Sequence, residues 1–101
     1  MSDYRTHNCG ELRISDVGKE VTICGFIQVV RDLGGVVFVD IRDMYGLTQV
    51  VTSGNDELVD FVSRIPNEST VSVTGTVRKR DAETINEKLP TGEVEIFIKD
   101  I

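Results

Sequence analysis

The residue of this sequence with the clearest candidate binding role is a phenylalanine among polar neighbours. In residues 36–43, aliphatic side chains alternate with a second set that includes Phe38 and Asp40. The aliphatic set is Val37, Val39 and Ile41. Because the aliphatic set supplies a core face, Phe38 is predicted to lie on the outer face, where a nucleotide base can stack on its ring. The alternative is that Phe38 packs under a loop or helix, and the alternation alone leaves both open.

The strand that carries Phe38 is the second half of a predicted hairpin. The first half, residues 21–31, is apolar and ends at Arg31, which brings a cation close to the aromatic ring. Between the halves, Gly34 and Gly35 predict a tight turn, because glycine adopts positive φ without a Cβ clash. Gly25, inside the first strand, indicates a bulge or sharp bend.

The rest of the chain predicts the elements that position this hairpin. A short helical turn is expected before Gly18. Later segments predict a third strand, a helix and two more strands, with the strands at residues 47–52, 70–80 and 93–99. The polar stretch 53–57 holds capping residues and early acids that suit the N-terminus of the helix, and apolar side chains follow at helical spacing over residues 58–65. Pro66 ends the helix. The polar loop at residues 81–92 is long for so small a chain, and such loops are usually functional or disordered.

This order of elements indicates an all-β fold with one helix, the five-stranded Greek-key barrel called the OB-fold, whose helix lies between strands 3 and 4. One domain is expected over residues 1–101, with a short N-terminal extension over about residues 1–19. Ligands of this fold lie across strands 2 and 3 and the adjoining loops. Arg31, Phe38, Gln49 and the loop after Arg80 fall in that region.

Composition limits the function classes. The net charge of −6 argues against a sequence-blind nucleic-acid binder, although the run Arg78-Lys79-Arg80 permits a local basic groove. No apolar run approaches the roughly 20 residues of a membrane span, and the N-terminus lacks the apolar segment of a signal peptide, so a cytoplasmic location is expected. Cys9 and Cys24 are predicted to be small buried groups. No metal cluster or nucleophile–base pair is evident in the sequence.

Six segments together resemble the N-terminal anticodon-binding domain of bacterial-type aspartyl-tRNA synthetases. They are residues 5–10, 31–35, 38–43, 48–50, 73–78 and 91–95. The resemblance implies a fragment of a class II ligase, whose catalytic domain would use ATP and magnesium, whereas this domain needs no cofactor. The implied partners are the tRNA(Asp) anticodon stem-loop and the catalytic domain, with no membrane. The parent is expected to be a homodimer and the isolated domain a monomer.

The resemblance also assigns roles to individual residues. Phe38 would stack on the middle anticodon base, a uracil, while Gln49 would hydrogen-bond to the edge of that base and Arg31 would lie close to it. Glu95 would accept hydrogen bonds from the first base, a guanine. Two residues at the mouth of the long loop would approach the third base and nearby phosphates: Arg80 and Asn86.

Departures from the family pattern keep other functions open. Val29, Val30 and Met44 occupy positions where arginine is common, and their lost charge should weaken RNA binding and flatten its salt dependence. One alternative is a general single-stranded nucleic-acid module. Another is a scaffold that binds protein, for which these three apolar residues should form one exposed patch. Asp40 and Arg78 are predicted to be a turn cap and a solvated side chain, outside the site.

Overall fold

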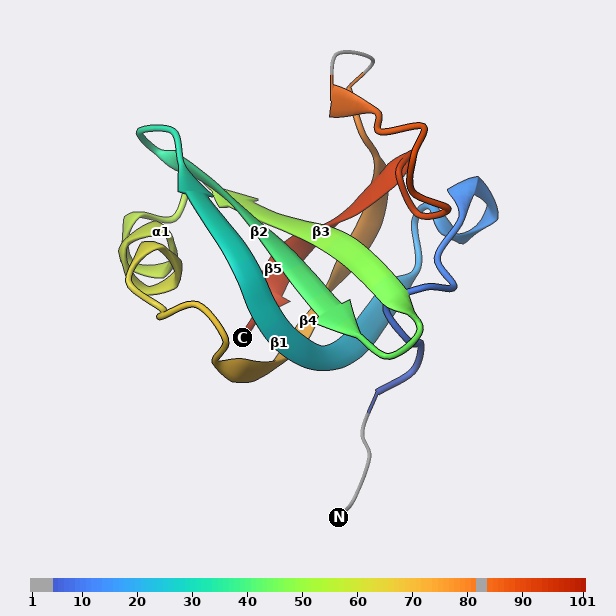
Figure 1. The fold of residues 1–101 in the computed structure, drawn as a ribbon. Helices are drawn as coiled ribbons and strands as arrows, with labels where there is room; N and C mark the ends of the chain where they lie inside the picture. The colour runs from blue at the N-terminus through green and yellow to red at the C-terminus, as the bar shows by residue number, and fades with distance from the viewer. Residues whose placement is uncertain (1–4, 82–83) are drawn as a thin grey trace.

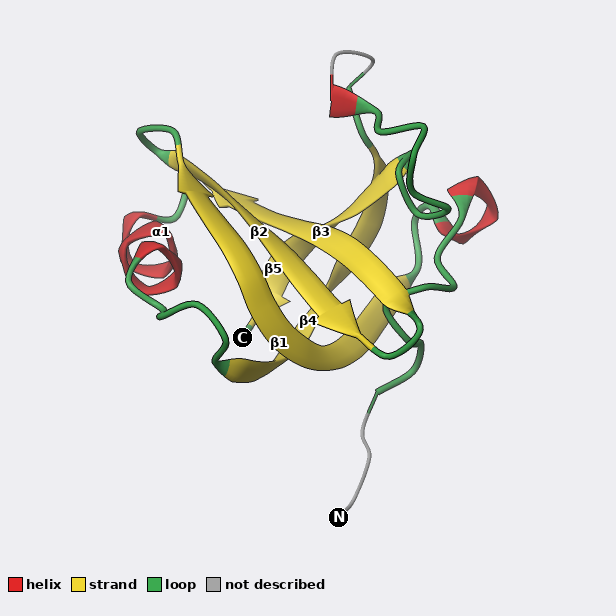
Figure 2. Cartoon of the chain, in the orientation of Figure 1, coloured by secondary structure: helices red, strands yellow, loops and turns green. Residues whose placement is uncertain are grey.

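The computed structural model describes residues 5–81 and 84–101. Its elements, in chain order, are η1 (Ile14–Asp16), β1 (Glu20–Asp32), β2 (Val36–Asp43), β3 (Gly46–Ser53), α1 (Asp56–Ser63), β4 (Thr70–Lys79) and β5 (Val94–Asp100). The strands form a closed barrel in the order β1-β2-β3-β5-β4 (Figures 1 and 2). The expected five-stranded barrel, with its helix between β3 and β4, is confirmed.

The barrel interior is aliphatic, as the period-two pattern predicts. Every strand contributes fully buried side chains, among them Ile23, Val39, Val50, Val73 and Ile96. The β3–β5 pairing is parallel and all other strand pairs are antiparallel. This parallel pairing closes the barrel and sets β3, from the middle of the chain, directly beside β5 at its end.

A bend in β1 allows this strand to serve both sides of the barrel. Its first half pairs with β4 and its second half with β2. The register shifts between Ile27 and Val29, so Gln28 is the extra residue of a bulge, and the bulge considered at Gly25 is not there. Gly25 is required for a different reason, because a Cβ there would lie 2.5 Å from the carbonyl oxygen of Arg42. The expected β1–β2 turn is confirmed, with φ of 75° at Gly34 and 91° at Gly35.

Helix α1 covers one end of the barrel (Figure 1). Asn55 caps it, since the Asn55 side-chain oxygen accepts a hydrogen bond from the Leu58 backbone N–H at 3.1 Å. Val62 is buried in the core, while the preceding residue, Phe61, is 56% exposed. No helix in the described part of the chain is long and apolar enough to cross a membrane.

The N-terminal segment packs against the side of the barrel that α1 leaves uncovered. The Cys9 backbone N–H donates to Asp43 Oδ2 at 2.9 Å, and the Thr48 hydroxyl donates to the Cys9 carbonyl at 2.7 Å. Cys9 is fully buried, as predicted, and burial beside Asp43 raises the pKa of its thiol to about 12. Cys24 is only half-buried, so the prediction for that cysteine was wrong.

Candidate nucleic-acid interface

An apolar row crosses the outer face of three neighbouring strands. Phe38 of β2 lies opposite Val51 of β3, and Val51 lies beside Phe97 of β5. Phe38 is half-buried, and it borders a hollow of about 300 Å³ together with Arg78 and Glu95. The ring therefore faces outward from the barrel and keeps part of its surface open to a ligand.

Beside the apolar row runs a polar row with one member from each strand, consisting of Arg31, Asp40, Gln49, Glu95 and Arg78. The Arg31 guanidinium donates to both carboxylate oxygens of Asp40, at 3.0 and 3.2 Å, and to Gln49 Oε1 at 3.3 Å. The Gln49 amide donates to Glu95 Oε1 at 2.8 Å. Arg78 Nε donates to Glu95 Oε2 at 2.7 Å. The five side chains thus form one connected hydrogen-bond network.

Burial within the polar row decreases from its centre to its ends. Gln49 and Glu95 are each only 5% exposed, whereas the side chains of Arg31 and Arg78 are 43% and 46% exposed. A carboxylate so deeply buried requires a cation or several donors, and Arg78 and Gln49 supply both. The arginines remain accessible at the surface, where a phosphate can reach them.

Sequence reasoning missed Asp40 and Arg78, which it placed outside the site. Asp40 orients Arg31, and Arg78 both pairs with Glu95 and lies over the Phe97 ring, 4.7 Å from its centroid. Their alternation already placed both residues on the outer face. What was missing was the strand register, which sets Arg78 directly opposite Glu95.

Arg80 lies beneath the long loop and not at its mouth. It is 5% exposed, and its guanidinium donates to the backbone carbonyls of Val94 at 2.9 Å and Thr84 at 3.0 Å. Its second terminal nitrogen has no partner among the described residues. Burial lowers the pKa of this guanidinium, although nearby Glu95 opposes the shift. In this structure Arg80 holds the loop against β5.

Asn86 is exposed on the same loop but lies apart from the polar row. Its side-chain oxygen accepts a hydrogen bond from the Lys88 backbone N–H at 3.1 Å, and its backbone N–H donates to the Gly92 carbonyl at 3.0 Å. It borders a separate hollow with Ile85 and Leu89. Its assignment to the third base therefore stays a prediction, as does that of Arg80.

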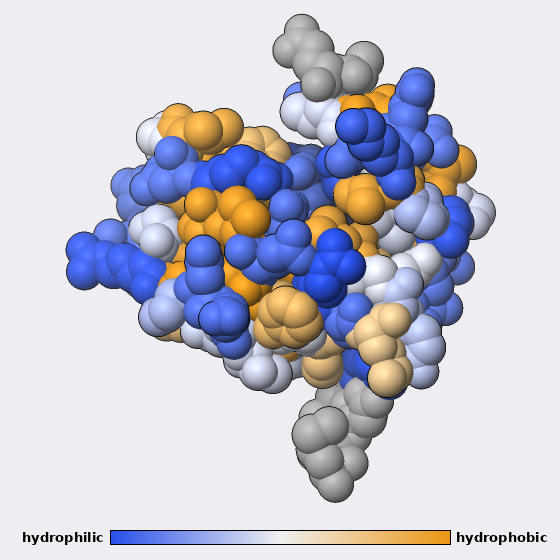
Figure 3. Space-filling view, in the orientation of Figure 1, coloured by the Kyte–Doolittle hydropathy of each residue, from blue (hydrophilic) through white to orange (hydrophobic). Residues whose placement is uncertain are grey.

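The three apolar residues at positions where arginine is common do not share one surface. Val30 packs against the core, Val29 is half-buried, and Met44 is 86% exposed at the β2–β3 turn. On the face shown in Figure 3, apolar areas are separated by hydrophilic side chains. The exposed patch expected for a protein-binding scaffold is thus not formed by these residues.

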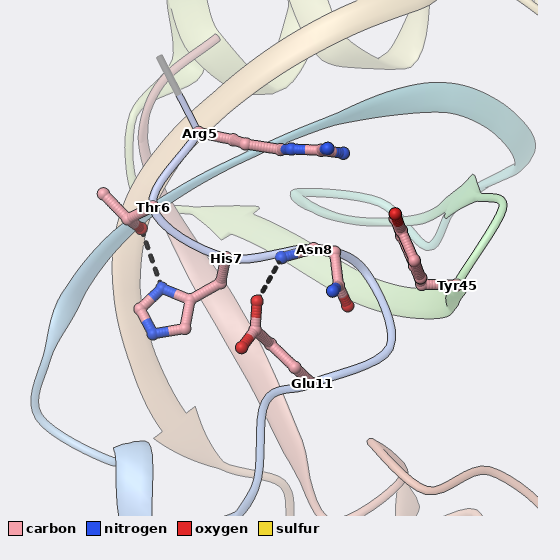
Figure 4. A pocket seen from close by; sticks show the side chains of 6 residues that line it. All are labelled: Arg5, Thr6, His7, Asn8, Glu11 and Tyr45. Atoms are coloured by element: carbon pink, nitrogen blue, oxygen red, sulfur yellow. Dashed lines mark hydrogen bonds between the residues drawn. The ribbon is translucent and has the colours of Figure 1, made fainter. Parts of the chain in front are cut away.

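A third hollow lies at the N-terminal segment, and none of the predicted site residues line it (Figure 4). Its lining includes His7, whose ring Nδ1 lies 2.8 Å from the Thr6 hydroxyl oxygen, and Tyr45, whose ring centroid is 5.8 Å from the Arg5 guanidinium. Arg5 also approaches Asp43, at 3.8 Å. The two Arg5 contacts join the N-terminal segment to the end of β2 and to the β2–β3 turn.

The fold and the outer face define a class: a five-stranded OB barrel with a partly exposed aromatic ring and a charged row on one surface. Residues 21–101 match the model of the OB-fold nucleic acid binding domain, and the chain belongs to this family. The resemblance to bacterial-type aspartyl-tRNA synthetases is also confirmed by individual relatives. The chain is 55% identical over 98 residues to the aspartate–tRNA(Asp/Asn) ligase of Rickettsia bellii, spanning 96% of this chain and 16% of that protein.

Two further proteins show the same likeness. The aspartate–tRNA ligase of Streptomyces coelicolor is 48% identical over 101 residues, which is 100% of this chain and 17% of the ligase. The solved aspartyl-tRNA synthetase of Entamoeba histolytica superposes with a TM-score of 0.77 at 30% identity, over 86% of this chain and 18% of that structure. The chain therefore spans about a sixth of the length of the curated relatives it matches.

Proposed function

We propose that this chain is the anticodon-reading module of an aspartate–tRNA ligase. The observation that carries the proposal is the polar row beside Phe38, because it combines a stacking surface, an amide, a carboxylate and two accessible cations on one face. Sequence-specific RNA recognition mostly targets unstacked bases of single-stranded loops, which are read by stacking and by hydrogen bonds to their edges. The family match and the names of the relatives favour a tRNA over other single strands.

In this proposal the middle anticodon base, a uracil, stacks on Phe38 and meets the Gln49 amide. The amide donates one N–H to Glu95 and accepts one hydrogen bond from Arg31, which leaves one N–H and one lone pair for the base. Uracil offers the matching acceptor and donor on neighbouring atoms. The 5% exposure of Gln49 suits contact with the edge of a base that lies above Phe38.

Glu95 reads the first base, a guanine, in the same proposal. The carboxylate accepts one hydrogen bond on each oxygen within the protein, and each oxygen keeps a further acceptor site. Guanine presents two adjacent N–H donors on its Watson–Crick edge, which the carboxylate can accept in parallel. Arg31 and Arg78, at the accessible ends of the row, contact the phosphates between the bases.

The remaining expectations concern the parent protein. Aminoacylation, with its ATP and magnesium, belongs to a catalytic domain that this module accompanies in a cytoplasmic, dimeric ligase, while the module alone is a monomer that reads RNA without a cofactor. Purified chain should therefore form no aspartyl-tRNA above background in an aminoacylation assay. Product formation by this chain alone would contradict the assignment of aminoacylation to a separate catalytic domain.

The proposal is tested by Glu95→Gln in a two-by-two titration. Wild type and variant are each titrated with anticodon stem-loops that carry guanine or adenine as the first base, at one fixed salt concentration. The variant should lose on the order of 1–3 kcal/mol of binding to the guanine stem-loop, as for a lost bidentate base contact, and much less to the adenine one. Equal losses for both stem-loops would remove the support for first-base reading.

Two controls accompany this titration. Asp60→Asn changes the net charge by the same amount but lies on α1, where Asp60 pairs with Arg64 at 3.1 Å, and it should leave binding unchanged. Random single strands of the same length test the alternative of a general single-stranded binder. If they bind as tightly as the stem-loop at the same salt concentration, the module does not read an anticodon.

A further inference from the structure

The Gln49 amide is held in one orientation by groups of opposite hydrogen-bonding character. On one side lies Glu95, which can only accept, 2.8 Å from Nε2; on the other lies Arg31, which can only donate, 3.3 Å from Oε1. Rotating the amide by half a turn would set its oxygen against a carboxylate and its N–H groups against a guanidinium. The present orientation is the one that satisfies both neighbours.

Both neighbours of Gln49 are themselves fixed. Asp40 binds Arg31 through both carboxylate oxygens, and Arg78 binds the second oxygen of Glu95. Gln49 and Glu95 are 5% exposed, so water has little access to replace either contact. The orientation of the amide is therefore set by four charged side chains on four other strands.

We propose that this fixed amide makes Glu95 a specificity-determining residue for the middle base, selecting uracil over cytosine. The inference rests on the proposed function, in which Gln49 contacts that base. Uracil and cytosine place opposite groups at the same two positions: uracil has an N–H donor and a carbonyl acceptor, where cytosine has a ring-nitrogen acceptor and an amino donor. An amide that rotated freely could match either base, whereas the fixed amide matches uracil alone.

It follows that the readings of the first and middle bases are coupled through the Gln49–Glu95 hydrogen bond. A change at Glu95 should alter more than the affinity for guanine. It should release the Gln49 amide, which then turns to match cytosine, and discrimination at the middle position should fall even though Gln49 is intact.

The binding test compares stem-loops with uracil or cytosine at the middle position, with the first base kept as guanine. Wild type should prefer uracil by roughly tenfold or more, the discrimination typical of a bidentate base contact. Gln49→Met should abolish most of that preference. Glu95→Gln should reduce the uracil-to-cytosine affinity ratio severalfold. The double variant, Glu95→Gln with Gln49→Met, should show the same ratio as Gln49→Met alone. The ratio is taken within one protein, so a change in the folded fraction cancels.

An unchanged uracil-to-cytosine ratio in Glu95→Gln would overturn the inference, because Glu95 would then act on the first base alone. Asp60→Asn is the matched control and should keep the wild-type ratio. A wild-type chain that binds neither stem-loop would overturn the proposed function and the uracil preference together.

A measurement without RNA tests the fixed amide by itself. The sequence has two glutamines, and Gln28 is the internal reference, because it is exposed on β1 and accepts a hydrogen bond from Arg42. Hydrogen exchange followed by NMR should show a protected side-chain amide at Gln49 and fast exchange at Gln28, with protection at Gln49 lost in Glu95→Gln. Exchange at Gln49 as fast as at Gln28 would overturn the fixed orientation while leaving the proposed function standing.

Discussion

Phe38→Ala separates a binding role for this residue from a structural one. Stacking of a base on an aromatic ring contributes about 1–3 kcal/mol, so loss of the ring should weaken stem-loop binding by roughly 5-fold to 150-fold. Truncating a fully buried phenylalanine destabilises a protein by about 3–5 kcal/mol. Phe38 is half-buried on the outer face, so the Phe38→Ala variant should lose less unfolding free energy, about 1–2 kcal/mol.

Two measurements on the same variant decide between these roles. Fluorescence anisotropy with a labelled anticodon stem-loop gives the loss of affinity, and urea unfolding gives the loss of stability. Phe61→Ala is the matched control, because it removes the same ring from an exposed position on α1 that does not line the hollow beside Phe38, and it should leave affinity unchanged. If Phe38→Ala unfolds early and the folded remainder binds normally, Phe38 is a core residue and the assignment of the interface fails.

Four further predictions concern the barrel itself. Arg80→Met removes two charge-assisted hydrogen bonds to backbone carbonyls and should lower the unfolding free energy by about 1.5–3 kcal/mol in urea, whereas an unchanged value would mean that the loop does not depend on Arg80. Gly75→Ala should lower the thermal midpoint markedly, because a Cβ there meets β5 backbone, and a wild-type midpoint would contradict this packing. With its pKa raised from 9.0 to about 12, Cys9 should contribute stability below pH 9 that is lost as the pH rises toward 12. Iodoacetamide at mildly alkaline pH should label Cys24 first, as mass spectrometry can check, and equal labelling would contradict the burial of Cys9.

The fold could be predicted because its signals are local. Strict alternation located β2 at residues 36–43, and two adjacent glycines located the turn before it. Capping residues and early acids predicted the start of the helix within residues 53–57, and α1 spans Asp56–Ser63 with Asn55 as its cap. Only its end differs, because the last apolar residue at helical spacing, Ile65, lies two residues beyond Ser63. Each of these signals depends on backbone conformation within a few residues of chain.

The candidate site was harder to predict because alternation separates the inside of the barrel from the outside, but not exposed outer residues from covered ones. Glu95 and Gln49 lie on the outer face, as expected, and are nevertheless buried, because side chains from neighbouring strands cover them. Their contact joins residues 46 positions apart and depends on the parallel pairing of β3 with β5. No pattern within one strand contains that information.

The bulge in β1 shows how much of the site depends on a single residue. In a regular strand Arg31 would share the face of Ile27, which is fully buried in the core. The extra residue, Gln28, reverses the alternation, so that Val30 packs against the core and Arg31 lies opposite Phe38 on the outer face. Only from that face can Arg31 reach both Asp40 and Gln49. The bulge is therefore what brings the Arg31 guanidinium to the interface. Its position is also the feature of β1 that the sequence analysis did not predict.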